Sequence, residues 1–123
     1  MTRRPDNAGA RITLLMRALA GDLARAWTVT EMGALLGVSD GQLRRLCAAG
    51  VGATPRQLLC NMRLQAAARL LRDPAMRIKE IQARVGIADA SHFCRDFRDR
   101  FGMSPTEYRR RSAERADSLD RVV

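Results

Sequence analysis

One pattern of residues occurs twice along this chain, and this repeat limits the possible folds more than any other feature. The spacing is 50 positions for the pairs Leu43/Phe93, Arg45/Arg95, Cys47/Phe97, Gly52/Gly102, Thr54/Ser104, Pro55/Pro105 and Gln57/Glu107. The spacing is 49 for the earlier pairs Glu31/Glu80, Met32/Ile81, Ala34/Ala83, Leu36/Val85 and Gly37/Gly86. The second copy therefore has one extra residue after its first glycine. A solenoid repeats more often, so the pattern predicts two copies of one small unit. A helical bundle that duplicated only for packing is the alternative.

Helix start and stop signals divide each copy into helices. Capping boxes occur at Thr28–Glu31, Thr54–Gln57 and Ser104–Glu107, and glycines follow the apolar stretches that the boxes open. With the spacing of the apolar residues, they predict helices over 11–27, 29–36, 39–49, 55–72, 77–85 and 89–101, and a last one from 104. The expected fold class is all-α, with about seven helices that form two helix-turn-helix subdomains joined by a long linker helix.

The same signals predict the domain organisation. We expect a flexible tail or linker end over 1–10, a first helix-turn-helix lobe over 11–53, the linker helix over 54–73, a second lobe over 74–111 and a frayed tail over 112–123.

Charge and cysteine content narrow the class of function. The chain has 22 Lys and Arg residues, 13 Asp and Glu residues and a net charge of +9, which indicates a polyanionic partner or an arginine-rich solvated surface. Cys47, Cys60 and Cys94 fit neither a disulfide framework nor, with the single His92, a zinc site. Neither a signal peptide nor a membrane-spanning run is evident. We therefore expect a cytoplasmic protein without metal, cofactor or membrane partner.

The second helix of each unit carries the predicted contacts with DNA bases. In a helix-turn-helix that helix lies in the major groove, where Arg pairs with guanine and Gln with adenine. We expect Leu43, Leu46, Phe93 and Phe97 to face the cores. The outward residues predicted to read bases are Gly41, Gln42, Arg44, Arg45, Ala90, Ser91, Cys94 and Arg95.

Further residues are predicted to contact the phosphates, through cationic side chains or at the N-termini of helices. They are Ser39, Thr54, Arg56, His92, Arg98, Arg100, Ser104 and Arg109. Any one exposed arginine is also compatible with a merely solvated surface. The recurrence of Arg45 as Arg95 at one spacing favours DNA binding.

The stretch from Ile78 to Arg110, IKEIQARVGIADASHFCRDFRDRFGMSPTEYRR, resembles the C-terminal signature of the AraC/XylS family of transcription regulators. The resemblance covers about residues 28–110. It implies a seven-helix domain that reads two successive major grooves on one DNA face, and regulators that are usually activators contacting RNA polymerase. The family's base contacts carry over to Gly41, Arg44 and Arg45 in the first unit, and to Ala90, Ser91, Cys94 and Arg95 in the second.

Some residues depart from the family pattern. Cys47 replaces an aromatic residue, Leu58 replaces a usual Tyr, and Gly33 and Gln82 stand where Ala is frequent. Gly41 has no side chain with which to contact a base, so the first unit is expected to be looser or to read fewer bases. Most family members also carry an N-terminal sensor or dimerisation domain. The chain is therefore a stand-alone regulator or the DNA-binding part of a longer one.

Two other functions compete with this interpretation. A protein-interaction module that lost DNA binding would show a neutral or acidic recognition face, which Arg44, Arg45 and Arg95 contradict. Related domains in DNA-repair methyltransferases use a four-cysteine zinc site, which three scattered cysteines cannot form. The sequence shows neither a Ser-His-Asp arrangement nor a pair of carboxylates that would indicate an active site. The sequence thus predicts a non-enzymatic transcription regulator, an activator, that binds double-stranded DNA sequence-specifically.

Overall fold

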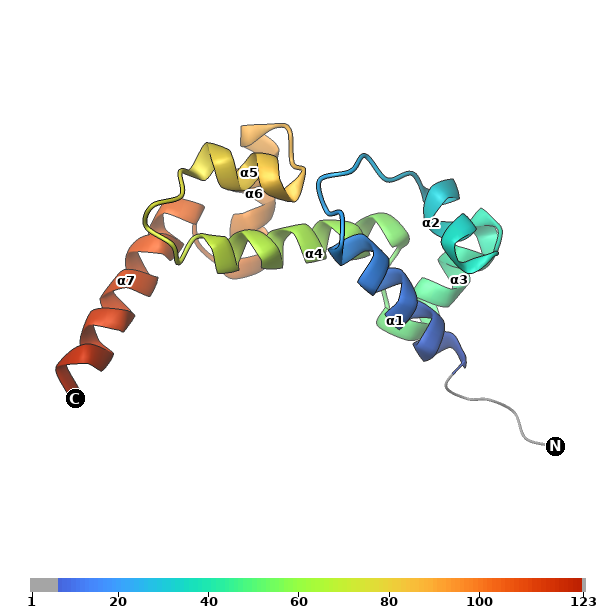
Figure 1. Cartoon of the computed structure of the whole chain (residues 1–123), viewed down its shortest axis with the longest axis horizontal. Coiled ribbons are helices and arrows are strands. Elements are labelled where there is room, and N and C mark those ends of the chain that lie inside the picture. The colour runs from blue at the N-terminus through green and yellow to red at the C-terminus, as the bar shows by residue number, and fades with distance from the viewer. Residues whose placement is uncertain (1–6, 123) are drawn as a thin grey trace. The chain divides into compact units, whose positions relative to one another are not determined.

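The chain folds into helices alone over the part that the structure describes. The structure is a computed structural model that describes residues 7–122, with side chains from residue 8 to residue 117. The described residues form seven helices and no strand (Figure 1): α1 Asn7–Ala20, α2 Val29–Leu36, α3 Asp40–Val51, α4 Pro55–Leu70, α5 Ile78–Val85, α6 Ala90–Phe101 and α7 Pro105–Val122. The expected all-α fold class is confirmed.

Local hydrogen bonds explain where the helices of the two helix-turn-helix pairs begin and end. Thr28 and Ser39 accept the amides of Glu31 and Gln42, and both capping boxes are closed. Glycines follow α2, α3, α5 and α6 at φ angles of 67°, 67°, 84° and 78°. A side chain is disfavoured at these angles, which explains why a glycine ends each of these helices.

Helix α1 differs from its expected range at both ends. It includes Asn7–Ala10, where the sequence predicted the end of a flexible tail over 1–10, while residues 1–6 lie outside the described part. It ends at Ala20 rather than Trp27. There the amides of Gly21 and Asp22 bond to the carbonyls of Arg17 and Leu19, which tightens and terminates the last turn.

Helix α7 continues to Val122, through the segment over 112–123 for which the sequence predicted a frayed tail; within that segment, Val123 lies outside the described residues. No Gly or Pro interrupts this segment after Pro105. Arg110 and Arg111 also form ion pairs with Glu107 at 3.0 and 3.3 Å, a spacing that supports helices. The capping box expected at its start is half formed, because Ser104 Oγ accepts the amide of Glu107 while the Glu107 carboxylate turns to these arginines.

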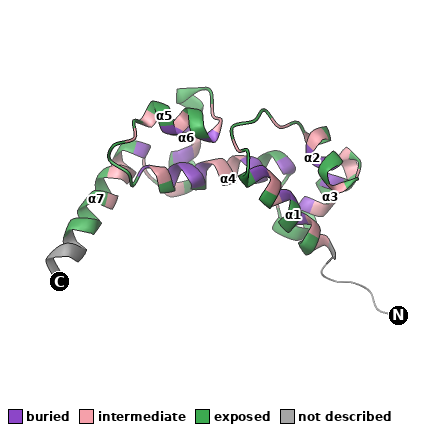
Figure 2. Ribbon diagram, viewed as in Figure 1, coloured by how far each residue is buried: buried purple, intermediate pink, exposed green. Residues whose placement is uncertain are grey.

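The chain divides into two compact units, residues 1–62 and 63–123. The boundary falls inside α4, whereas the sequence predicted a separate linker helix over 54–73. Each half of α4 supplies buried residues to its own unit (Figure 2). The helix also ends at Leu70, two residues before the expected Arg72, where Asp73 Oδ1 accepts the amide of Ala75 in a tight turn.

The interiors of the two units have different compositions. The core of the first unit is aliphatic and consists of Ile12, Leu15, Leu19, Met32, Leu43, Cys47, Leu58 and Leu59. The second unit buries Leu64, Ala66, Ala67, Ala68, Leu71, Ile81, Val85, Phe93 and Phe97. Within it, the Phe97 ring lies 5.8, 4.5 and 5.4 Å from the rings of Phe93, Phe101 and Tyr108. Each unit therefore has its own hydrophobic core.

Candidate nucleic-acid interface

Helix α3 presents a continuous outward face in the first unit. Gly41, Arg44, Arg45 and Ala48 follow the i, i+3, i+4, i+7 spacing of one helix face, and the last three are exposed. Leu43 is completely buried on the opposite side and Leu46 is half-buried, as the sequence predicted for the core side. The face therefore offers two arginine side chains above a surface of small residues.

Arg45 is directed toward the start of α3. A β-carbon built on Gly41 would lie 3.7 Å from Nη1 of Arg45, an ordinary van der Waals distance. Helical side chains lean toward the N-terminus of their helix, which explains this direction. The guanidinium therefore lies over the first turn, the part of a recognition helix that contacts base edges.

Helix α6 presents the matching face in the second unit. Ser91, Cys94, Arg95 and Arg98 occupy the same spacing and are exposed. Phe93 and Phe97 are completely buried on the other side, as predicted. The two faces share one arginine at the same position and differ at the other three.

The exposed arginines of the two faces are available for an outside partner. Arg44, Arg45 and Arg95 form no ion pair with any residue that the structure describes. Most of the predicted phosphate contacts are exposed too, namely Ser39, Thr54, Arg56, His92, Arg98 and Arg100. Arg100 also lies over the Phe101 ring at 5.7 Å.

Gln42 is held in a different role from the predicted one. Its Oε1 accepts hydrogen bonds from the amide of Ser39 at 2.9 Å and from Ser39 Oγ at 3.2 Å. An adenine contact needs the amide oxygen and nitrogen together, and the oxygen is occupied by the cap. This capping role could have been predicted from the sequence, because Ser39 and Gln42 have the spacing of a capping box.

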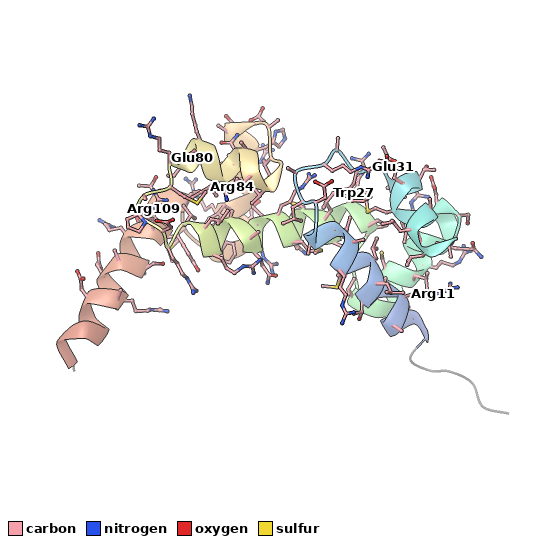
Figure 3. The ribbon with its side chains drawn as sticks, viewed as in Figure 1. Arg11, Trp27, Glu31, Glu80, Arg84 and Arg109 are labelled. Carbon is pink, nitrogen blue, oxygen red and sulfur yellow. The ribbon has the colours of Figure 1, made fainter. Side chains whose placement is uncertain are left out.

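Arg109 is the clearest departure from the predicted contacts. Its Nε donates to the Leu71 carbonyl at 3.0 Å, and its Nη2 donates to the carbonyls of Asp73 and Met76 (Figure 3). The side chain is half-buried and ties α7 to the end of α4 and the loop after it. An arginine side chain has five N–H donors, and three of those of Arg109, on Nε and Nη2, bond to carbonyls within the protein. These bonds give Arg109 a structural role that the sequence, which predicted a phosphate contact here, did not indicate.

A hydrogen bond between α2 and α3 corresponds to no pattern in the sequence. Thr30 Oγ1 donates to Asp40 Oδ2 at 3.1 Å and joins the two helices of the first helix-turn-helix. At the corresponding positions the second unit has Lys79 and Ala90, which cannot form this bond. Neither residue belongs to a local motif, so only the spatial arrangement reveals the pair.

A second group that the sequence did not indicate lies between α1 and α2. The Trp27 Nε1 donates to the Asp22 carbonyl at 2.9 Å, and the Arg25 guanidinium lies 4.4 Å from the Trp27 ring. Arg25 also pairs with Glu31 at 2.9 Å. The hydrogen bond from the Thr28 amide, followed by that from Arg25, lowers the pKa of Glu31. This group holds the connection into α2.

The start of α6 carries an acid as its cap. Asp89 Oδ1 accepts the amide of His92 at 3.0 Å, and this hydrogen bond lowers the pKa of Asp89. His92 is exposed, with Nδ1 3.7 Å from Asp89 Oδ2. The cap keeps the Asp89 carboxylate at the N-terminus of α6, next to the predicted base contacts Ala90 and Ser91.

Residues 7–122 contain neither a metal-binding cluster nor a helix that could span a membrane. No group of three or more His, Cys, Asp or Glu side chains within this part lies close enough to hold a metal ion. No described helix combines the length and the apolar character needed to cross a membrane.

Comparison with known proteins identifies the family. The pattern of a family described as "Helix-turn-helix domain" matches residues 32–111. The chain is 30% identical to the HTH-type transcriptional regulator GadX of Escherichia coli over 108 residues, which is 88% of this chain and 39% of GadX. It is 30% identical to the HTH-type transcriptional activator RhaS of Escherichia coli over 104 residues, which is 85% of this chain and 37% of RhaS. The chain spans about a third of the length of the curated relatives that it matches first.

Solved structures agree with this assignment. The fold is similar to that of a DNA-binding transcriptional dual regulator from Escherichia coli K-12, with a TM-score of 0.77, 28% identity and coverage of 93% of this chain and 98% of the other. A transcriptional regulator with an AraC-type DNA-binding domain from Chromobacterium violaceum gives a TM-score of 0.80, 27% identity and coverage of 87% and 97%. The chain belongs to the AraC family of helix-turn-helix domains, and the relatives and solved structures named here are transcription regulators.

Proposed function

We propose that the chain binds double-stranded DNA sequence-specifically and reads two adjacent major grooves with α3 and α6. The observation that carries the proposal is the pair of equivalent outward faces, each on the second helix of a helix-turn-helix and each with an exposed arginine, Arg45 or Arg95. The net charge of +9 suits a polyanionic partner. The relatives named above as DNA-binding regulators support the same function.

The base-reading residues follow from these faces. We assign the first half-site to Gly41, Arg44 and Arg45, and the second to Ala90, Ser91, Cys94 and Arg95. Gln42 and Arg109 leave the predicted sets because their side chains are used within the protein. Two arginines on α3 favour guanine in the first half-site, since the guanidinium meets O6 and N7 together.

Phosphate contacts position the two helices. We assign them to the exposed Ser39, Thr54, Arg56, His92, Arg98 and Arg100 and to Ser104 at the start of α7. Amides at the starts of α4 and α7 add donors for the backbone phosphates. Such contacts would weaken with salt for every DNA sequence alike.

The wider biological role extends the proposal. We propose that the chain regulates transcription in the cytoplasm as an activator that contacts RNA polymerase. The much greater length of its relatives supports a role as the DNA-binding part of a longer regulator with a sensor or dimerisation domain.

The first test separates base reading from general attraction to DNA. After selection of bound sites from random DNA, Arg45→Ala and Arg95→Ala should each lose ~1–3 kcal/mol on the selected site and relax the preference for the base contacted. Arg17→Ala, an exposed position on α1 outside both faces, is the matched control and should change little. Equal losses of affinity on selected and random DNA would contradict base reading. If the chain produced no gel mobility shift with any DNA at low salt, a protein-interaction module would be favoured instead.

The second test addresses the use of two grooves. Insertion of five base pairs between the half-sites turns one of them by about half a helical turn. The affinity should then fall nearly to that of a single unit for its own half-site. Unchanged affinity would mean that only one helix reads bases.

A further inference from the structure

The second unit contains an open groove that the proposed DNA contacts do not use. It has a volume of about 640 Å³ and is lined by the segment that follows α4, by Met103 and by α7. Its lining along α7 extends from Tyr108 to Asp117, about 14 Å at ~1.5 Å per residue. None of the outward residues assigned to base reading on α6 lines it.

The groove combines an apolar floor with a cationic rim. Leu71 is completely buried in the floor, and Tyr108 and Met103 beside it are half-buried. Arg72 and Arg115 on the rim are exposed and form no ion pair with any described residue. Arg111 shares Glu107 with Arg110, so its charge is partly compensated. Asp117 is the single acidic residue among the lining residues.

The three hydrogen bonds of Arg109, called here the Arg109 clamp, hold the two walls of the groove together. By bonding to the carbonyls of Leu71, Asp73 and Met76, it holds the loop wall against α7. A groove with fixed walls loses little conformational entropy when a partner occupies it.

We propose that this groove binds an acidic segment of a partner protein that carries one or two apolar side chains. The apolar floor would accept the apolar side chains, and the rim arginines would pair with Asp and Glu of the segment. An open groove of this length suits a peptide segment better than an enclosed small molecule, which is usually buried over most of its surface. The proposal goes beyond DNA binding and does not depend on it.

The experiment uses the whole chain and a defined probe. The probe is a fluorescein-labelled peptide of about 12 residues that alternates Glu with Leu, and a peptide that alternates Glu with Ser is its apolar-free control. The double variant Arg72→Glu/Arg115→Glu reverses the rim. The double variant Arg69→Glu/Arg84→Glu changes two exposed arginines of the same unit outside the groove and lowers the net charge by the same amount.

The expected result is specific to the groove. Fluorescence anisotropy should show about tenfold weaker binding of the Glu-Leu probe to the rim variant and less than about a twofold change for the control variant. In NMR spectra the probe should shift the amides of residues 71–74 and 108–117. Thermal melts should show both variants folded, because all four positions are exposed.

Three results would overturn the proposal. Equal weakening by the two double variants would reduce the effect to net charge. Equal binding of the Glu-Ser peptide would show that the apolar floor is unused. If a random duplex of about 20 base pairs displaced the probe, and the rim variant lost more affinity for that duplex than the control variant, the groove would be a phosphate contact.

Discussion

The two units of this chain use one helix-turn-helix plan with different interiors. In the first unit Cys47 fills the position that Phe97 fills in the second, and α1 packs on both α2 and α3. In the second unit the aromatic rings of α6 pack against Tyr108 of α7. The first unit thus completes a small core with a preceding helix, and the second fills its own with larger side chains and a following helix. The outward faces can therefore keep the same place on the helix, with Arg45 and Arg95 at one position, while the residues of the two cores differ.

The turns between the helices show the same divergence on a smaller scale. A β-carbon built on Gly33 would lie 2.7 Å from the Val38 carbonyl oxygen, so α2 and the turn are in close contact. The second unit has one more residue in its turn and has Gln82 at the matching position. The Nε2 of Gln82 donates to the Ala88 carbonyl at 3.1 Å. The longer turn leaves room for a side chain, which then bonds to it.

The largest expected difference lies at the position that Cys47 and Phe97 share. Phe97→Ala should destabilise the protein by ~3–5 kcal/mol, because it removes the ring at the centre of the aromatic cluster. Cys47→Ala removes one buried sulfur atom and should cost about 1 kcal/mol. Urea unfolding followed by circular dichroism measures both. Similar costs would show that the two cores do not differ in the way proposed.

Arg109 tests whether the second unit depends on its clamp. Arg109→Ala should cost about 2–3 kcal/mol, because it removes hydrogen bonds from a charged group to carbonyls of the partly buried loop. The neighbouring Arg110→Ala, which loses only exposed ion pairs, should cost at most about 1 kcal/mol. Hydrogen exchange should localise the loss to the second unit. A variant that stays fully stable but binds every DNA sequence less tightly would restore Arg109 as a phosphate contact.

Substitutions at Gly33 and Gln82 compare the two turns directly. Gly33→Ala should destabilise by about 1–3 kcal/mol despite the higher helix propensity of Ala, because its methyl group meets a backbone oxygen. Gln82→Ala loses one exposed hydrogen bond and gains propensity, so the change should stay within about 1 kcal/mol. Thermal melts of the two variants provide the measurement. A stabilised Gly33→Ala protein would contradict the close approach at the first turn.

The smallest expected effect concerns the caps of α2 and α5. Thr28 caps α2 through its hydroxyl, whereas Arg77 stands at the matching place before α5 and has no acceptor; only Glu80 reaches back to its amide, at 3.1 Å. Arg77→Thr should therefore stabilise the protein by about 0.5–1 kcal/mol, and Thr28→Ala should cost about 1 kcal/mol. Urea titrations can resolve both. If Arg77→Thr destabilised the chain, the arginine would have a role beyond the cap.

The sequence by itself determined the repeat, the number of helices, most of their ends and the two faces of each recognition helix. These follow from local rules, because caps, glycines and apolar spacing act over a few residues, and so Phe93 and Phe97 were correctly predicted to be buried. The tertiary structure decided the use of Arg109, which contacts carbonyls 33 to 38 positions away, and the bond between Thr30 and Asp40. It also placed the boundary of the two units inside α4. A local pattern contains no information on which groups distant in sequence come into contact. These tertiary contacts decide whether an arginine side chain is free to contact DNA or is bonded within the protein.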